Sequence, residues 1–247
     1  TRAQLVYGIE NGTGLRIVRD LTGRDDGRIS PDPLLVLETS ESTDFGTGAN
    51  ANGDFNADGF SDLIYGEPGA SNDTGAVHLH YGSVDGYTST PDLTLTGLHE
   101  GARFGASLAM VDDADGNGYD DILVGAPNQN NDTGNSTGTI QLFTGFATGL
   151  NSIPIWMTSG DTIDGLFGAH VEAAGDVNGD GYADFMVSEM GWEGADEGLG
   201  RVHVYLGNST LESESTIIVG HADDLILGYA ILGVGDANAD GFDDIVI

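Results

Sequence analysis

One nine-residue pattern occurs four times in this chain and limits its fold more than any other feature. The copies span residues 54–62, 113–121, 176–184 and 236–244, and they start 59, 63 and 60 residues apart. Each copy has Asp or Asn at positions 1, 3, 5 and 9, Gly at position 6 and an aromatic residue at position 7. A repeat of this length is typical of propellers and other repetitive architectures. The chain is therefore expected to consist of similar units of about 60 residues.

The repeated pattern has the composition of a hard-cation site. Ca²⁺ binds six to eight oxygen atoms at roughly 2.3–2.6 Å, and alternate Asp and Asn residues around a Gly-permitted turn supply such oxygens locally. The aromatic residue would offer its backbone carbonyl. We predict up to four Ca²⁺ ions, held by Asp54, Asn56, Asp58, Phe60 and Asp62, by Asp113, Asp115, Asn117, Tyr119 and Asp121, by Asp176, Asn178, Asp180, Tyr182 and Asp184, and by Asp236, Asn238, Asp240, Phe242 and Asp244.

The residues that follow each loop exclude an EF-hand. An EF-hand needs a bidentate Glu at position 12, whereas position 12 is occupied here by Tyr65, Val124, Val187 and Ile247. Short apolar runs leave the loops and indicate buried strands rather than helices. A single loop of this kind is commonly a plain polar turn, but four copies in one register favour a metal site.

The charge is unusually negative. Asp and Glu number 40 against seven basic residues, all of them Arg, which gives a net charge of −33. Four bound Ca²⁺ ions would add eight positive charges and leave −25. Nucleic acid is excluded as a partner, because no basic stripe could displace phosphate counterions. Such a surface suits high ionic strength, where charge repulsion is screened, so we expect a saline or marine environment.

Cysteine usage and calcium supply indicate the compartment. The chain has no cysteine, so metal loops rather than disulfides would stabilise it. It has no run of 18 apolar residues and no segment resembling a signal peptide, so we expect a mature segment without a membrane span. Extracellular Ca²⁺ modules work at affinities of about 10⁻⁴–10⁻³ M. We therefore expect an extracellular or cell-surface location.

The units share further features. A Phe-Gly pair at 45–46, 104–105 and 167–168, replaced by Leu-Gly at 227–228, precedes a short strand, the acidic loop and an apolar strand. A variable loop, an alternating strand (77–82, 140–145 and 202–207) and a fourth strand such as 93–96 follow. Four antiparallel strands form one propeller blade. We expect the Phe to fill the gap between blades and the Gly to let backbones approach.

Residues 104–108 (FGASL) and 113–127 (DADGNGYDDILVGAP) resemble the FG-GAP repeat of the integrin α-subunit β-propeller and of its bacterial and archaeal relatives. The resemblance implies that the acidic loop joins the first two strands of a blade and binds Ca²⁺, and that loops on the opposite face meet ligands. The third unit departs from the pattern, with Val-Ser-Glu-Met at 187–190 in place of Gly-Ala-Pro. The family propeller usually has seven blades.

The predicted fold is all-β: a single β-propeller domain over residues 1–247, with four-stranded antiparallel blades. Residues 3–8 match a third strand and 34–38 a fourth, while the sequence stops after a second strand. Three continuous blades would then span 45–103, 104–166 and 167–226, and residues 1–44 plus 227–247 would form a split closing blade. Membership of a seven-bladed ring is the alternative.

The sequence shows no catalytic motif, so we predict no catalytic residues. His78 and His203 share a repeat column with Gln4 and Gln141, which indicates a structural polar position. His170 and Glu172 share a strand face and could act as acid and base, although burial between blades is the favoured interpretation.

Ligand binding is predicted on the variable loops at 67–75, 126–138 and 188–200, because loops released from a repeat commonly carry binding. Trp156 lies in a fourth-strand position and is expected in the core. Trp192 and Glu193 lie in the third variable loop. Trp192 would either stack on a sugar ring or an apolar partner surface, or fold back as a plug over the central channel.

The sequence as a whole favours a Ca²⁺-stabilised, non-catalytic binding or adhesion module that meets a protein or glycan ligand at a cell surface. One alternative is a carbohydrate-binding lectin, which would repeat an aromatic residue at equivalent loop positions. Another is a catalytic or non-catalytic part of an enzyme that degrades polysaccharides or cleaves lipid anchors, which would need convergent acids and bases near the axis.

Overall fold

The computed structural model describes residues 44, 49–131, 134–193, 199–210, 215–220 and 226–247, with side chains for residue 44 and from residue 53 onward. It also describes the backbone of three strands nearer the N-terminus. In these parts of the chain no helix is long and apolar enough to cross a membrane.

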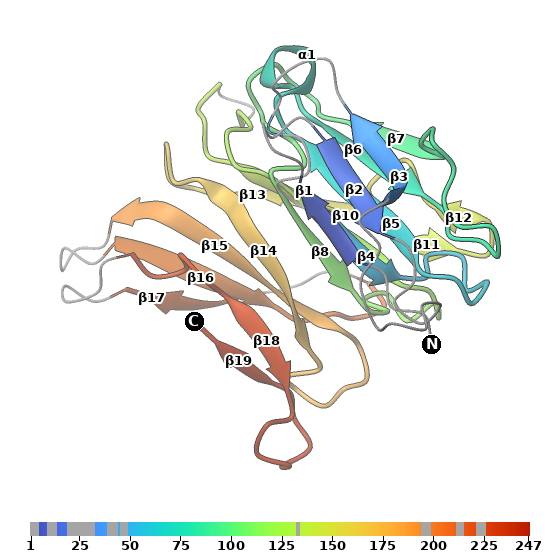
Figure 1. The fold of residues 1–247 in the computed structure, drawn as a ribbon. Coiled ribbons are helices and arrows are strands. Elements are labelled where there is room, and N and C mark those ends of the chain that lie inside the picture. Colours follow the sequence, from blue (N-terminus) through green and yellow to red (C-terminus); the bar gives the residue numbers. More distant parts are fainter. Residues whose placement is uncertain are drawn as a thin grey trace.

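The chain is all-β, and its antiparallel sheets follow one another in sequence order (Figure 1). The three central sheets each have four strands. They consist of β4 (Ala49–Gly53), β5 (Asp62–Glu67), β6 (Ala76–His80) and β7 (Leu93–Thr96); of β8 (Ser107–Val111), β9 (Asp121–Ala126), β10 (Thr139–Phe143) and β13 (Trp156–Ser159); and of β14 (Phe167–Gly175), β15 (Asp184–Glu193), β16 (Leu199–Tyr205) and β17 (Ser215–Val219). Within each sheet every strand pairs with the next one along the chain, apart from a small hairpin inserted before β13. This meander is the arrangement predicted for a blade.

The remaining elements are small. The inserted hairpin is β11 (Gly145–Phe146) with β12 (Gly149–Leu150), and the helical turn α1 (Ala70–Asp73) lies between β5 and β6. A three-stranded sheet precedes the central sheets and a two-stranded sheet follows them; they consist of β1 (Leu5–Gly8), β2 (Gly14–Val18) and β3 (Pro33–Glu38), and of β18 (Leu232–Gly235) and β19 (Asp244–Val246).

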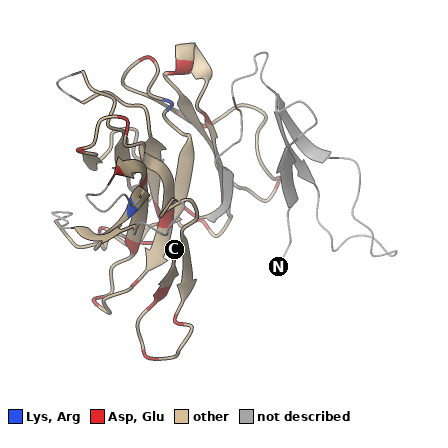
Figure 2. Cartoon of the chain, turned by 90° about the vertical axis from the view of Figure 1, so that its left-hand side faces the viewer, with Lys and Arg blue, Asp and Glu red and all other residues tan. Residues whose placement is uncertain are grey.

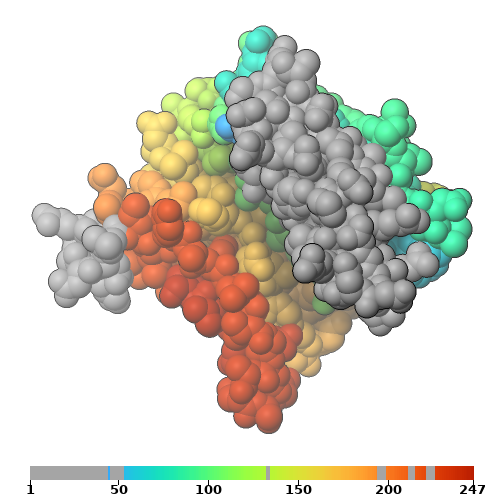
Figure 3. Space-filling model, in the orientation of Figure 1, coloured from blue at the N-terminus to red at the C-terminus, as the bar shows by residue number. Residues whose placement is uncertain are grey.

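The core lies between neighbouring sheets. Strands β9 and β10 are buried along their whole length, because one face of their sheet packs against the sheet before it and the other against the sheet after it. Ile122 and Val124 pack with Val77 and Phe104, whereas Leu123 and Leu142 pack with Phe167 and Phe185. Figure 3 shows the sheets as adjoining layers in chain order, from green through yellow to red. Alternating side chains on buried strands thus fill two layers at once.

The Phe-Gly pairs act as predicted where the structure describes them. Phe104 and Phe167 are buried between sheets. A Cβ on Gly66 would lie 1.9 Å from the carbonyl oxygen of Gly105, so this close approach of two backbones requires glycine. In the third central sheet the equivalent residue is Ser188, whose Oγ accepts the His170 N–H at 2.9 Å. The pair at 45–46 lies outside the described residues.

The terminal sheets differ from the predicted split blade. Strand β2, which the sequence analysis left unassigned, lies between β1 and β3 and pairs with both. Residues 3–8 were expected to form a third strand, but Leu5–Gly8 pairs as the first strand of its sheet. Strand β19 pairs with β18 and with no other described strand. The described strands thus form a three-stranded and a two-stranded terminal sheet, and the split closing blade stays a prediction.

The additional strand has a clear physical origin. Leu15, Ile17 and Val18 surround Arg16 in a short β-branched run, which is strand-forming even though it is not repeated at 60-residue spacing. The blade boundaries predicted at 1–44 and 227–247 rest on repeat spacing, which does not reveal a strand that occurs once. The number of blades, four or seven, stays a prediction.

Candidate calcium-binding loops and the opposite rim

Each repeated loop connects the first two strands of its unit. Residues 54–62 join β4 to β5, 113–121 join β8 to β9, 176–184 join β14 to β15, and 236–244 join β18 to β19. Figure 2 shows acidic residues in red on these loops. Among the residues whose side chains the structure describes, the basic residues are Arg103 and Arg201, and both form ion pairs with carboxylates.

The first Asp of each loop closes the turn. In the first loop the two carboxylate oxygens of Asp54 accept the N–H groups of Asp58 at 3.0 Å and Gly59 at 2.8 Å. The other three loops repeat both bonds. The position-6 glycine is left-handed in all four loops, with φ between 89° and 95°. The prediction that glycine permits a sharp turn is therefore confirmed.

Position 4 is left-handed as well, which the sequence analysis missed. Its residues are Ala57, Gly116, Gly179 and Ala239, with φ from 53° to 78°. The signal was weak because two of the four are Ala, which reaches this region only at a cost of about 1–2 kcal/mol. Loop closure by the first Asp offsets that strain.

Positions 3 and 5 always hold one Asp and one Asn. Asn56 donates its side-chain N–H to Asp58 at 3.0 Å, and Asn178 donates in the same way to Asp180 at 2.9 Å. The second loop has the two residue types exchanged, and Asn117 donates back to Asp115 at 3.1 Å. The exchange preserves both the amide–carboxylate bond and the charge of −3 that positions 1, 3, 5 and 9 carry together in each loop.

The ninth residue ties the loop to its sheet. The two carboxylate oxygens of Asp121 accept the N–H groups of Ala114 at 2.9 Å and of Gly145, which follows the third strand, at 3.1 Å. Asp62 and Asp184 make the same pair of bonds. In the last loop Asp244 accepts the Ala237 N–H at 3.0 Å.

Burial makes these ninth residues costly to ionise. Desolvation is the largest cause, with repulsion from loop carboxylates adding to it, and together they raise the pKa of Asp121 to about 8 and those of Asp62 and Asp184 to about 6. Backbone hydrogen bonds offset part of the increase. A divalent cation would compensate such charges.

The second loop gathers its carboxylates most tightly. One oxygen from each of Asp113, Asp115 and Asp121 lies within 4.8 Å of the other two. This is an all-oxygen donor set with no basic partner in the loop, so the residues present fit a hard divalent cation. Asp54, Asp176 and Asp236 occupy the same place in their loops as Asp113.

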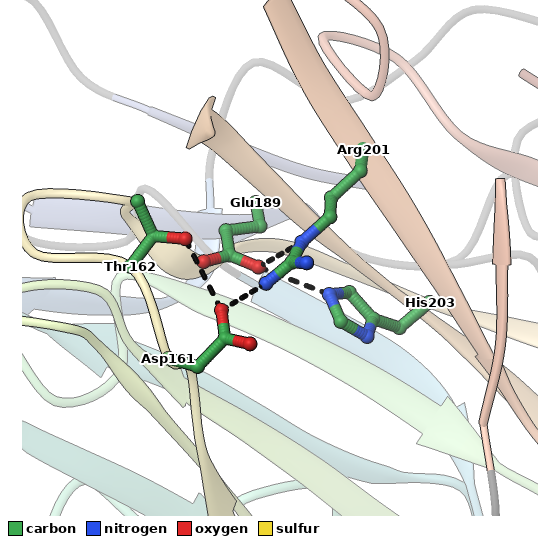
Figure 4. Close-up of polar contacts among 5 residues, drawn as sticks. All are labelled: Asp161, Thr162, Glu189, Arg201 and His203. Atoms are coloured by element: carbon green, nitrogen blue, oxygen red, sulfur yellow. Dashed lines mark hydrogen bonds and ion pairs between the residues drawn. The ribbon is translucent and has the colours of Figure 1, made fainter. Parts of the chain in front are cut away.

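A second polar cluster lies at the other end of the third central sheet. Glu189 pairs with Arg201 across β15 and β16, far from the loop residue Asp184 at which β15 begins. The Arg201 Nε donates to Glu189 at 2.6 Å, its Nη2 contacts Asp161, and His203 lies 3.0 Å from Glu189 (Figure 4). Glu189 is fully buried, so this network joins the β13–β14 connection to the hairpin formed by β15 and β16.

Trp192 was predicted to lie in a loop, but it lies in strand β15. Strand β15 continues to Glu193, which pairs with Leu199 after an irregularity in the ladder that follows Glu189. The half-buried Trp192 ring lies 5.3 Å from the guanidinium carbon of Arg201, a cation–π contact. Glu193 is exposed at the strand end. The ladder between β15 and β16 extends because the irregularity lets both strands continue beyond the length of the repeat.

The polar column is structural, as predicted. His78 lies 3.0 Å from Glu67, and the His203 ring packs edge-on against Phe167 at 5.1 Å. Gln141 is buried at the same position of the middle sheet. Gln4 lies outside the described residues.

Two other sequence interpretations can be checked. The Trp156 ring packs edge-on against Phe185 and Tyr205, which confirms it as a core residue. His170 was expected to be buried between sheets, but it is exposed because the alternation of β14 turns its side chain outward. Partial desolvation lowers the pKa of His170 and raises that of the half-buried Glu172.

Comparison with known proteins identifies the class of this fold. The FG-GAP repeat family matches residues 47–80, 104–143 and 167–205, which are the first three strands of each central sheet. The chain is therefore an FG-GAP repeat protein with a β-propeller fold.

Individual relatives indicate the group of FG-GAP proteins to which the chain belongs. It is 30% identical over 205 residues to integrin alpha-5 of Xenopus laevis and 31% identical over 177 residues to integrin alpha-V of Gallus gallus, matches that cover 77% and 67% of this chain. It is 29% identical over 211 residues, 77% of the chain, to the phosphatidylinositol-glycan-specific phospholipase D of Bos taurus. The chain belongs with the integrin alpha-like FG-GAP proteins. The matches cover 18%, 16% and 25% of these relatives.

Proposed function

We propose that this chain is a calcium-stabilised, non-catalytic binding or adhesion module of a secreted or cell-surface protein. The observation that carries the proposal is the loop frame repeated four times, in which backbone N–H groups orient Asp oxygens that form no ion pair with a basic residue in the described part of the chain. Asp113, Asp115 and Asp121 form its tightest cluster. The likeness to integrin alpha chains supports a binding role.

Calcium would act on the fold rather than on a reaction. Positions 1, 3, 5 and 9 would supply side-chain oxygens and position 7 a carbonyl, so each ion would join both ends of its loop. Asp62, Asp121 and Asp184 also bind a backbone N–H after the third strand. A cation would therefore connect the first three strands of a blade.

The chelation experiment tests this proposal. At free Ca²⁺ a hundredfold above the dissociation constant, each site would add about 2.7 kcal/mol to the free energy of unfolding. The melting temperature should therefore fall when Ca²⁺ is removed by EGTA and recover when it is restored. Asp180→Ala should reduce the increase in melting temperature that calcium produces. Asp85→Ala, in an exposed turn outside the loops, should leave that increase unchanged. A melting temperature insensitive to EGTA would refute the proposal.

We further propose that ligands meet the rim opposite the calcium loops, where Trp192 and Glu193 end β15. A partner protein or glycan is the proposed ligand. Arg201 covers part of the Trp192 ring, so the aromatic surface is held in a fixed orientation, which lowers the entropic cost of binding.

The phospholipase D likeness does not make catalysis the better proposal. That match covers a quarter of the bovine enzyme. In the described residues the buried Glu189 at this rim is taken up by ion pairs with Arg201 and His203. We propose that the shared part serves binding in both proteins.

A further inference from the structure

Neighbouring calcium loops touch each other through position 8. The side chain of Asp120, at position 8 of the second loop, accepts the backbone N–H of Asp54, the first residue of the first loop, at 2.9 Å. Asp243 in the fourth loop accepts the N–H of Asp176 in the third loop at 2.8 Å, and its own N–H donates to the Asp176 carbonyl at 3.0 Å. These bonds span 66 and 67 residues of sequence.

The junction between the second and third loops is different. Position 8 of the third loop is Ala183, which has no carboxylate, and its N–H donates to the Asp113 carbonyl at 3.3 Å. The residue before the loop changes in parallel: it is Gly53 or Gly175 at the linked junctions and Asp112 at the middle one. A Cβ on Gly175 would lie 2.0 Å from Asp243 Oδ2, so the linked junction there needs glycine.

We propose that Asp120 and Asp243 are positioning residues that couple the four loops as two pairs. The first pair is 54–62 with 113–121, and the second is 176–184 with 236–244. A cation in one loop of a pair would raise the affinity of the other loop, while the two middle loops bind independently. This inference rests on the proposed calcium binding.

The geometry supplies a direct route for the coupling. Asp120 lies between Tyr119 and Asp121, whose carbonyl and carboxylate oxygens are proposed ligands, so a cation in the second loop would fix the position of Asp120. Asp120 in turn holds the backbone of Asp54, whose carboxylate closes the first loop. The same relations connect Asp243 with Asp176.

Electrostatics act in the same direction. The Asp120 carboxylate interacts repulsively with Asp54, Asp112 and Asp113. A cation in either loop of the pair would offset part of this repulsion and make the inter-loop bond stronger. Because coupling between two sites is reciprocal, each cation would assist the other to the same extent.

Proteins with two remaining loops test the proposal. Asp180→Ala with Asp240→Ala leaves the first pair, whereas Asp58→Ala with Asp240→Ala leaves the two middle loops. Calcium titrations by calorimetry on the full chain should show positive cooperativity in the first protein, with the second ion bound about tenfold more tightly. The second protein should bind its two ions independently.

Asp120→Asn is the decisive variant, because it keeps the shape of the side chain but replaces the charge-assisted bond to the Asp54 N–H with a weaker neutral one and removes the repulsion with Asp54. Added to the first protein, it should abolish most of the tenfold cooperativity while two ions still bind. Ser61→Ala is the matched control, since Ser61 is position 8 of the first loop and forms neither link. It should leave the cooperativity unchanged.

The outcomes separate the two proposals. If the four-loop chain binds no Ca²⁺, the calcium function itself is refuted. If ions bind but the first pair shows no cooperativity, or keeps it in Asp120→Asn, the coupling is refuted. Equal cooperativity in the two middle loops would also refute it. Should Asp120→Asn not fold, Asp243→Asn in a protein that retains only the second pair provides the same comparison.

Discussion

At the scale of single residues, Asp side chains at different positions of a loop have different roles. The ninth Asp of a loop is buried and hydrogen-bonded to backbone on both oxygens, as in Asp121. The third-position Asp115 is half-buried and contacts its own loop. Both residues are proposed ligands, but only the ninth Asp also anchors the loop to its sheet.

Substitutions should separate these roles when Ca²⁺ is absent. In EGTA, Asp121→Ala should lower the free energy of unfolding by about 1–3 kcal/mol for each buried N–H left without an acceptor. Asp115→Ala should have little effect there, because it relieves repulsion between loop carboxylates. Urea denaturation of both variants in EGTA measures the difference. Equal losses would show that position 9 has no separate anchoring role.

A second residue-scale prediction concerns pH. His80 is fully buried, and burial lowers its pKa below the ordinary 6.5. The unfolded chain therefore binds this proton more readily, so the contribution of His80 to stability is complete above about pH 6.5 and is lost as the pH falls towards the folded-state value.

His80→Phe removes this titration, and Phe143 occupies the equivalent position in the next sheet. Urea denaturation of both proteins between pH 8 and 5, in EGTA, should give curves that converge as the pH falls, because only the wild-type chain pays for protonating this imidazole. Parallel curves would contradict the assignment.

At the scale of elements, each central sheet has a candidate calcium loop at one end and, at the other, the hairpin that we propose meets ligands. The calcium loop precedes the second strand, and antiparallel pairing puts the hairpin between the second and third strands at the other end. The two ends can therefore vary separately: the loops repeat closely, while the hairpins differ in length and sequence. Strands β15 and β16 differ most from the repeat, because Trp192 lies beyond the regular ladder and contacts Arg201 at the end of that ladder.

Trp192→Ala should abolish binding to intact cells or to a glycan array. The change in unfolding free energy should stay within about 1 kcal/mol, because the Trp192 ring is only half-buried. Binding assays combined with thermal melts in Ca²⁺ measure both effects. Thr158→Ala, on an outer strand of the second central sheet, is the control. Joint loss of binding and stability would indicate a structural plug, and unchanged binding would place the ligand elsewhere.

At the scale of the whole molecule, charge is unbalanced. The net charge is −33, and both arginines whose side chains the structure describes are already paired with acidic residues. Long-range repulsion therefore opposes the compact state. Calcium in four loops would reduce the charge only to −25.

Salt should therefore stabilise the chain. Raising NaCl from 0.1 to 1 M shortens the screening length from about 10 to 3 Å, so the melting temperature should increase, and by more in EGTA than in Ca²⁺. Scanning calorimetry at matched osmolality, with sorbitol as the control solute, measures the effect. A decrease with salt would show that local ion pairs such as Arg201–Glu189 outweigh the general repulsion.

The sequence by itself determined what is local and repeated. Alternate Asp and Asn residues around a position-6 glycine predict the loop conformation, because those contacts join residues at most nine apart. The apolar runs after each loop predict the second strands, and the Phe-Gly pairs predict the packing between sheets. Each of these signals occurs several times, which separates it from chance.

Only the tertiary structure decided what is distant or unique. The bond from Asp120 to Asp54 joins two different blades, and the Gly145 N–H reaches Asp121 because the third strand returns beside it. Strand β2 and the extension that carries Trp192 occur once, so no repeated pattern predicted them. The physical reason is that local propensity chooses the conformation of a segment, whereas its partners depend on how the sheets pack against each other.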